Sequence, residues 1–112
     1  MDKVLVISGD LANLARVKSA CIPTGCDIAL ATRLPENAIP DPVKGVVVDL
    51  GWLREPPATV AELLRTHYPS ARLIAFGPHV QEARLSAAEE AGFTVLTRGQ
   101  LERGLASLLR KP

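Results

Sequence analysis

Residues 44–50 read Lys44-Gly45-Val46-Val47-Val48-Asp49-Leu50, an apolar run that delivers one carboxylate near its end. An unbroken β-branched run of this kind is typical of a strand that is buried on both faces of a parallel sheet. A second such run, Val4 to Ile7, ends shortly before Asp10. In open α/β sheets, ligands bind just beyond the carboxyl ends of the strands. The two runs therefore predict a site at that edge, near Asp49 and Asp10.

Strands and helices alternate along the rest of the chain, which is the pattern of a parallel sheet covered on both faces. The predicted strands are 3–8, 27–32, 44–50, 71–77 and 93–97, and the predicted helices are 11–21, 58–67, 80–91 and 100–110. Thr59 and Glu62 stand at capping-box spacing near the start of the second predicted helix. We predict an α/β fold with a (βα)5 pattern that forms a single domain, residues 1–112.

Residues 33–43 break this alternation, because three prolines leave too little uninterrupted chain for a crossover helix. We expect a loop with at most one helical turn, so that the second helix of the pattern is short or missing. The right-handed crossover rule still carries this segment across the sheet. We therefore expect one face to be thinly covered between the second and third strands, with an exposed apolar patch there as a candidate contact surface.

Composition excludes several classes of function. The 112 residues carry a net charge of +1 with acids and bases interspersed, which gives no basic footprint for nucleic acid or an anionic membrane surface. Aromatic residues make up only 4%, which leaves no stacking platform for single-stranded nucleic acid. No apolar run approaches the roughly 20 residues that span a bilayer. We predict a cytoplasmic protein that binds neither nucleic acid nor membrane.

Cys21 and Cys26 are the only two cysteines, and they lie five positions apart across a Pro23 and Gly25 turn. This spacing fits neither the CxxC redox motif nor a zinc site, which would need further Cys or His ligands. Two interpretations remain. Reduced thiols are expected in the cytoplasm, and a local disulfide is the alternative.

The (βα)5 order resembles the receiver domain of two-component response regulators over nearly the whole chain. The resemblance implies a three-layer flavodoxin-like sandwich with a five-stranded parallel sheet in the order 2-1-3-4-5. Receivers accept a phosphoryl group on an aspartate at the end of the third strand, and Val46-Val47-Val48-Asp49-Leu50 matches that position. By this resemblance Asp49 is phosphoacceptor-like. A carboxylate can attack phosphorus when a divalent cation neutralises the incoming charge.

The other positions that receivers use are altered in this chain. Receivers hold magnesium with an acidic pair directly after the first strand, where this chain has Ser8 and Gly9 and only then Asp10. They place Thr or Ser after the fourth strand, where Gly77 stands, and Lys-Pro after the fifth, where Arg98 stands and no proline follows. The chain thus resembles a degenerate receiver, or pseudo-receiver. We expect no cofactor, with weak Mg²⁺ binding left open.

Structural roles are also open to the candidate site residues. Asp49 can accept hydrogen bonds from the loop that follows it, and Asp10 is well placed to cap the first helix. Arg98 can form an ion pair with Asp49, and His79 is either a proton carrier or a solvated loop residue. Trp52 is expected to pack over the edge of the core. The predicted binding crevice consists of Ser8, Gly9, Asp10, Gly77, His79 and Arg98.

Taken together, these features predict a stand-alone signalling module that acts by protein–protein interaction, without conventional magnesium-dependent aspartyl phosphorylation and without enzyme activity. Receivers usually contact partners or dimerise through their fourth helix, fifth strand and fifth helix, here 80–91, 93–97 and 100–110. Leu85 lies on that surface, off the alanine stripe of its helix. Two alternatives stay open: a phosphoacceptor that uses Asp49, and a flavodoxin-like domain that binds a small molecule at the crevice.

Overall fold

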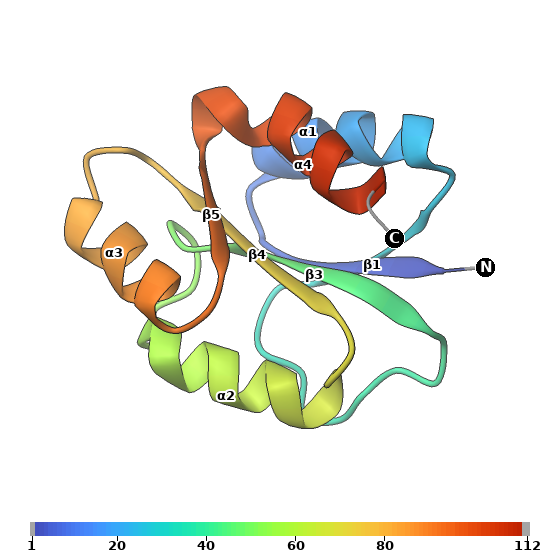
Figure 1. Cartoon of the computed structure of the whole chain (residues 1–112), viewed down its shortest axis with the longest axis horizontal. Coiled ribbons are helices and arrows are strands. Elements are labelled where there is room, and N and C mark those ends of the chain that lie inside the picture. Colours follow the sequence, from blue (N-terminus) through green and yellow to red (C-terminus); the bar gives the residue numbers. More distant parts are fainter. Residues whose placement is uncertain (1, 111–112) are drawn as a thin grey trace.

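Within residues 2–110, which are the residues that the computed structural model describes, five parallel strands and four α-helices form three layers (Figure 1). The strands are β1 (Lys3–Ile7), β2 (Asp27–Ala31), β3 (Val43–Asp49), β4 (Arg72–Gly77) and β5 (Thr94–Thr97). The α-helices are α1 (Leu11–Cys21), α2 (Pro57–His67), α3 (Glu82–Glu90) and α4 (Leu101–Arg110), with 3₁₀ turns η1 (Ile22–Thr24) and η2 (Arg98–Gln100). The sheet order β2-β1-β3-β4-β5 confirms the predicted fold class. Residues 1, 111 and 112 of the predicted 1–112 domain lie outside the described range.

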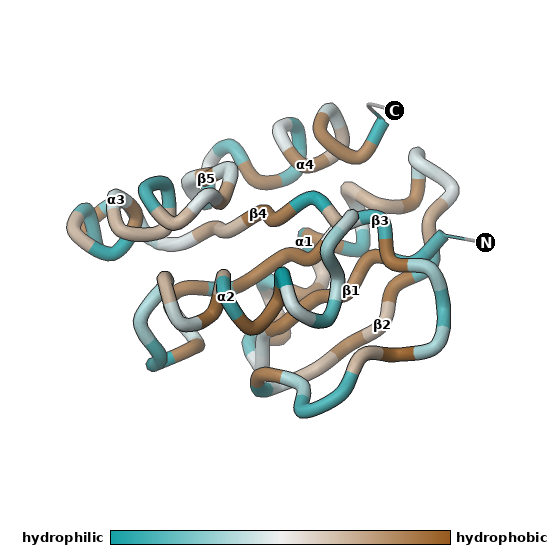
Figure 2. The backbone as a smooth tube through the Cα atoms, turned by 60° about the horizontal axis from the view of Figure 1, so that its bottom comes forward, coloured by the Kyte–Doolittle hydropathy of each residue, from teal (hydrophilic) through white to brown (hydrophobic). Residues whose placement is uncertain are grey.

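The sheet separates two apolar cores, because successive side chains of a strand point to opposite faces. Helices α1 and α4 cover one face, and α2 and α3 cover the other (Figure 1). Val46 and Val48 of β3 face the α2 side, whereas Val47 faces the α1 side, and all three are fully buried. In Figure 2 the central strands are mostly brown, the colour of hydrophobic residues. The apolar run around residue 47 is therefore buried on both sides, as its sequence predicts.

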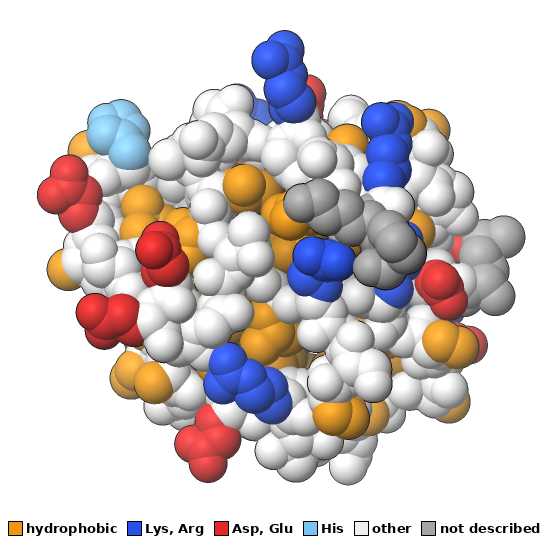
Figure 3. Space-filling model, viewed as in Figure 1, with side chains coloured by type: hydrophobic (Ala, Val, Ile, Leu, Met, Phe, Trp, Pro, Cys, Tyr) orange, Lys and Arg blue, Asp and Glu red, His pale blue; other side chains and the backbone are white. Residues whose placement is uncertain are grey.

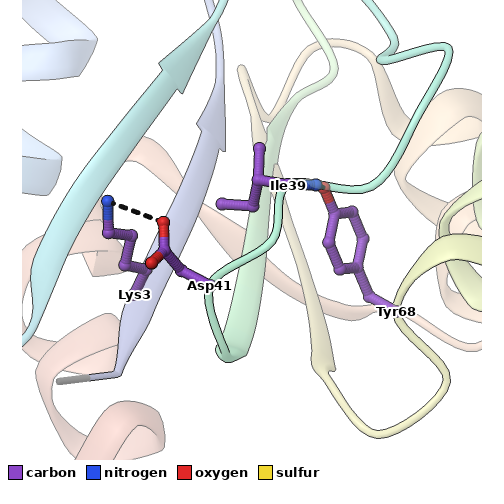
Figure 4. Close-up of polar contacts among 4 residues, drawn as sticks. All are labelled: Lys3, Ile39, Asp41 and Tyr68. Atoms are coloured by element: carbon purple, nitrogen blue, oxygen red, sulfur yellow. Dashed lines mark hydrogen bonds and ion pairs between the residues drawn. The ribbon is translucent and has the colours of Figure 1, made fainter.

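The segment between β2 and β3 is a loop without a helical turn, so the second helix of the (βα)5 pattern is missing, which is one of the two expected outcomes. Three contacts hold it across the sheet instead. The Ile39 amide donates to the Tyr68 hydroxyl at 3.0 Å, Lys3 pairs with Asp41 at 3.1 Å (Figure 4), and the side chains of Leu34 and Ile39 pack on the α2-side core. Both side chains are half-buried. The loop itself therefore covers this face, and the exposed apolar patch expected there is not found.

The predicted start of the helix at 58–67 needs a correction. Helix α2 begins at Pro57, its N-cap is Pro56, and Thr59 lies inside the helix, so the Thr59–Glu62 capping box is not formed. Proline at the first helical position is favourable, because its φ is already helical and its missing N–H would have no partner there. Helix α3 ends just before Gly92, whose positive φ of +106° is a backbone conformation that favours glycine after a helix.

Both cysteines are free thiols in the structure, as one of the two interpretations predicts. Cys21 is buried at the end of α1, and Cys26 is half-buried ahead of β2. Burial, followed by the proximity of Cys26, raises the pKa of the Cys21 thiol to about 11. Cys21 therefore stays protonated near neutral pH and behaves as an apolar side chain. None of the helices within residues 2–110 has the length and hydropathy that a bilayer crossing would need.

Candidate functional site at the carboxyl edge of the sheet

Asp49, the last residue of β3, carries the central carboxylate of the site. Its side chain is only 2% exposed. Oδ2 accepts hydrogen bonds from the Ser8 hydroxyl at 2.7 Å and from the Asn13 side-chain amide at 3.0 Å, and Oδ1 accepts one from the Gly51 backbone N–H at 3.0 Å. A buried carboxylate is costly unless hydrogen bonds compensate for its lost hydration. Three uncharged donors supply that compensation here.

The donors to Asp49 come from three connections of the fold. Ser8 follows β1, which pairs directly with β3, so its hydroxyl lies beside the end of β3. Asn13 lies in the first turn of α1, where the helix N-terminus favours a negative charge. The Asp10 N–H donates to the Ser8 hydroxyl at 3.1 Å, so the Ser8 oxygen accepts one bond and donates another. Such a chain of hydrogen bonds polarises and strengthens its members.

Asp10 caps helix α1, as predicted. Its Oδ1 accepts from the backbone N–H groups of Ala12 at 2.9 Å and Asn13 at 3.1 Å. That carboxylate oxygen is therefore directed at the helix N-terminus, while the Asp10 backbone takes part in the network through Ser8. A Ser, Thr, Asp or Asn cap of this kind typically contributes about 1 kcal/mol to stability.

The magnesium site that the resemblance to receivers implies does not fit these residues. Magnesium demands near-octahedral oxygen ligation, usually with one or two carboxylates among its ligands. Both oxygens of Asp49 instead accept hydrogen bonds, and the Asp10 side chain caps a helix. Across residues 2–110, no three His, Cys, Asp or Glu side chains come together as a metal cluster. The hydrogen-bond donors around Asp49 stabilise its negative charge and take up acceptor positions that a magnesium ion would need.

Trp52 lies across the loop that follows β1. Its indole N–H donates to the Thr32 carbonyl at 2.7 Å, and a Cβ placed on Gly9 would overlap the Trp52 ring. Trp52 is 46% exposed, so it covers Gly9 while part of it meets solvent. Trp52 covers Gly9 but belongs to neither of the two apolar cores, so the expected packing over the edge of the core is met only in part. Trp52 also puts an indole over the position that the small-molecule alternative assigns to a ligand.

Replacing Gly9 with alanine is expected to move the Trp52 ring, because the new methyl group overlaps it. The Thr32 bond should weaken, the free energy of unfolding should fall by about 1–3 kcal/mol as for other overpacked sites, and tryptophan fluorescence should shift. Gly99→Ala is the matched control, since a Cβ there meets only the Thr97 hydroxyl at 3.9 Å. Identical emission spectra for Gly9→Ala and the unaltered protein would show that the ring does not cover Gly9.

Arg84 of α3 fixes the loop between β3 and α2. Its Nε donates to the Leu50 carbonyl at 2.9 Å, and Nη2 donates to the carbonyls of Leu53 at 2.6 Å and Glu55 at 3.0 Å. One guanidinium thus bonds three backbone oxygens of the loop that begins just after Asp49. Neither Arg84 nor Asn13 was among the residues predicted for the site. No local motif marks either residue, since each acts on a chain segment more than 25 positions away.

The structure brings together only part of the predicted crevice. Ser8 and the backbone of Asp10 join the Asp49 network, and Gly9 lies under Trp52. Gly77 is buried, and a Cβ there would touch Leu50 at 3.4 Å.

His79 and Arg98 are exposed and lie outside the Asp49 network. The expected Arg98–Asp49 ion pair is wrong, because Lys3–Asp41 is the one ion pair among residues 2–110. Arg98 follows β5, and β4 lies between β5 and β3. Two strand spacings put about 10 Å between the backbones of these strands.

Several solved structures share this fold. A response regulator receiver domain protein from Methanospirillum hungatei superposes with a TM-score of 0.76 at 14% identity, over 98% of this chain and 91% of that one. A receiver domain protein from Clostridium thermocellum gives a TM-score of 0.76 at 16% identity over 97% and 91%. A response regulator from Thermotoga maritima gives 0.73 at 16% identity, over 98% of each chain.

No protein-family model and no curated protein matches the sequence. The likeness to the solved structures lies in the order and packing of the elements and extends over nearly the whole chain. The chain therefore has the fold of a response regulator receiver domain.

Proposed function

We propose that this protein is a pseudo-receiver, a cytoplasmic signalling module in which Asp49 stabilises the fold and is not phosphorylated. The observation that carries the proposal is the set of three hydrogen bonds that the Asp49 carboxylate already accepts from the protein, out of about four that it can accept. Phosphorylation needs a carboxylate oxygen that is free to attack phosphorus and a cation beside it. Here Oδ2 already accepts two hydrogen bonds at 3.0 Å or less, and Oδ1 accepts a third.

The parts that relay phosphorylation in receivers are also replaced. Gly77 offers no hydroxyl at the end of β4, and Arg98 is exposed. Arg84 ties α3 to the loop after Asp49 through three hydrogen bonds. These contacts favour one fixed arrangement of α3 and that loop. We infer that the protein presents a constant binding surface to a protein partner.

The surface formed by α3, β5 and α4 is the proposed contact surface for that partner. It faces the reader in Figure 3, where acidic side chains lie over α3 and apolar atoms show between the helices. A hollow of about 730 Å³ lies between β5 and α4. It is lined by Val95, Leu96, Gly99, Gln100, Glu102, Arg103, Gly104 and Ser107. Leu85, expected to be exposed here, is half-buried against the α2-side core, so it contributes less to this surface than expected.

The test is a titration of backbone amide NMR signals with Mg²⁺ and then with beryllofluoride, which mimics an aspartyl phosphate. We expect no saturable shifts at Ser8, Asn13, Asp49 or Gly51. A response regulator receiver with an intact acidic pair, titrated in parallel, is the positive control. Saturable shifts around Asp49 that disappear in Asp49→Asn would overturn the proposal and identify a phosphoacceptor with unusual ligands.

A further inference from the structure

Helix α1 and the 3₁₀ turn η1 that continues it end at a left-handed glycine. Gly25 has φ +72° and ψ +14°, a conformation that glycine adopts without strain. Its N–H donates to the Ile22 carbonyl at 3.2 Å, which is one of the two hydrogen bonds of a Schellman helix end. In that motif the side chain that follows the glycine commonly contacts the side chain four residues before the glycine. Here these two residues are Cys26 and Cys21.

The Thr24 hydroxyl takes over the second hydrogen bond of the motif. It donates to the Cys21 carbonyl at 2.6 Å, the acceptor that the Cys26 N–H would otherwise use. The sulfur atom of Cys26 lies 3.9 Å from the Thr24 carbonyl oxygen, so the thiol points back toward the same turn. Backbone and side-chain contacts therefore both hold the turn that carries the two cysteines.

The two thiols also share one apolar core. Cys21 is 1% exposed in the core on the α1 and α4 side of the sheet, and the half-buried Cys26 packs against that core. Burial raises the pKa of the Cys21 thiol, and the nearby Cys26 raises it further. The helix end, the common core and this electrostatic coupling agree that the two thiols are neighbours.

The two thiols differ in their access to solvent. Cys26 is partly exposed, whereas Cys21 is buried and stays protonated near neutral pH. A dissolved reagent therefore reaches Cys26 first, and Cys21 is placed to react with whatever is bound to the Cys26 sulfur. An accessible cysteine beside a second, resolving cysteine is the arrangement found in redox-sensitive pairs.

We propose that Cys21 and Cys26 form a reversible dithiol–disulfide pair that a small disulfide of the glutathione class oxidises. The Cys26 thiolate attacks one sulfur of that disulfide, whose S–S bond breaks and releases one thiolate. The Cys21 thiol gives its proton to solvent and attacks the Cys26 sulfur, which forms the Cys21–Cys26 bond and expels the second thiolate. The protein gives up two electrons and two protons, and the reagent takes them up as two thiols. The free thiols of the structure are the reduced state of this pair.

This pair lies away from the Asp49 site. Cys21 is the last residue of α1, whereas Asn13, which donates to Asp49, lies in its first turn. A helix of eleven residues is about 16 Å long. Oxidation of the pair can therefore be measured without disturbing the carboxylate, and its outcome does not depend on whether Asp49 is phosphorylated.

The test incubates the full chain with reduced and oxidised glutathione at about 1 mM each and measures the products by mass spectrometry after acid quenching. The main product should be the chain less two hydrogen atoms. It should exceed the mixed disulfide with glutathione about tenfold or more, because a thiol in contact has an effective concentration well above that of the dissolved one. Dithiothreitol should restore both free thiols.

Three substitutions check the roles of the residues. Cys21→Ala should leave a lasting mixed disulfide at Cys26, and Cys26→Ser should stay unmodified because Cys21 is buried. Gly25→Ala should lower the ratio of bridge to mixed disulfide about fivefold or more, because the positive φ strains alanine although its Cβ meets no atom within 4 Å. Gly99→Ala, at a glycine without positive φ, is the matched control. Circular dichroism confirms that each variant is folded.

The measurement on the unaltered chain needs no substitution, so it decides the proposal even if Cys21→Ala does not fold. A lasting mixed disulfide without a bridge, bridges that form only between two chains, or no reaction with glutathione would each overturn the proposal. Modification of Cys21 in Cys26→Ser would contradict the order of the two steps. A ratio in Gly25→Ala equal to that of Gly99→Ala would show that this turn does not position the pair.

Discussion

Replacing Asp49 with leucine is expected to lower the free energy of unfolding by about 3 kcal/mol, although leucine has a similar size and is apolar. The substitution leaves the Ser8 hydroxyl and the Asn13 amide in the interior without their acceptor. Both residues are at most 4% exposed, so water cannot readily take the place of the carboxylate. An unsatisfied buried polar group costs about 1–3 kcal/mol. Chemical denaturation with circular dichroism measures the change.

Asp49→Asn should cost less, about 1–2 kcal/mol, because its carbonyl oxygen can still accept from Ser8 and Asn13 while its NH₂ group opposes the Gly51 N–H. Combining Asp49→Leu with Ser8→Ala should recover part of the loss, since one orphaned donor is then removed. If Asp49→Leu left the free energy of unfolding unchanged or raised it, the carboxylate would not stabilise the fold. A chemical role would then have to account for the aspartate at this position.

The sequence predicted the layout of the fold because that layout depends on short-range patterns. The β-branched run before Asp49 and the prolines before β3 each report on their own segment of the chain. The capping box at Thr59 was wrong because Pro57 starts the helix earlier. The order of the strands came from the resemblance to receivers, not from the local patterns.

The site was predicted less well, because its contacts join residues that are far apart in the chain. The position of Asp49 at a strand end was predictable, and so was the cap at Asp10. What surrounds Asp49 was not, since Asn13 reaches it from 36 residues away. The Arg98 ion pair was a reasonable expectation only while the other partners of Asp49 were unknown. The Asp49 carboxylate accepts hydrogen bonds from three uncharged donors. Strand β4 lies between β3, which ends at Asp49, and β5, which precedes Arg98.

Replacing Arg84 with methionine is expected to lower the free energy of unfolding by about 2–3 kcal/mol and to loosen the loop after Asp49. The guanidinium makes three hydrogen bonds to the carbonyls of Leu50, Leu53 and Glu55, and methionine keeps most of its apolar stem but none of its donors. Hydrogen bonds from a charged group contribute about 1.5–3 kcal/mol each when buried, and half-exposure of Arg84 reduces their sum.

Hydrogen exchange of backbone amides should show which segment becomes less protected when the Arg84 contacts are lost. The amides of Trp52 and Leu53, which donate to the Asp49 carbonyl, should exchange faster in Arg84→Met, whereas the amides of β1 should change only as much as global stability does. Arg103→Met, at an exposed position of α4, is the control. Arg84→Lys should restore little, because one ammonium group cannot reproduce the fork that spans three carbonyls. If loop exchange in Arg84→Met matched that of the control, this arginine would not hold the loop, and the fixed arrangement inferred for α3 would lose its main support.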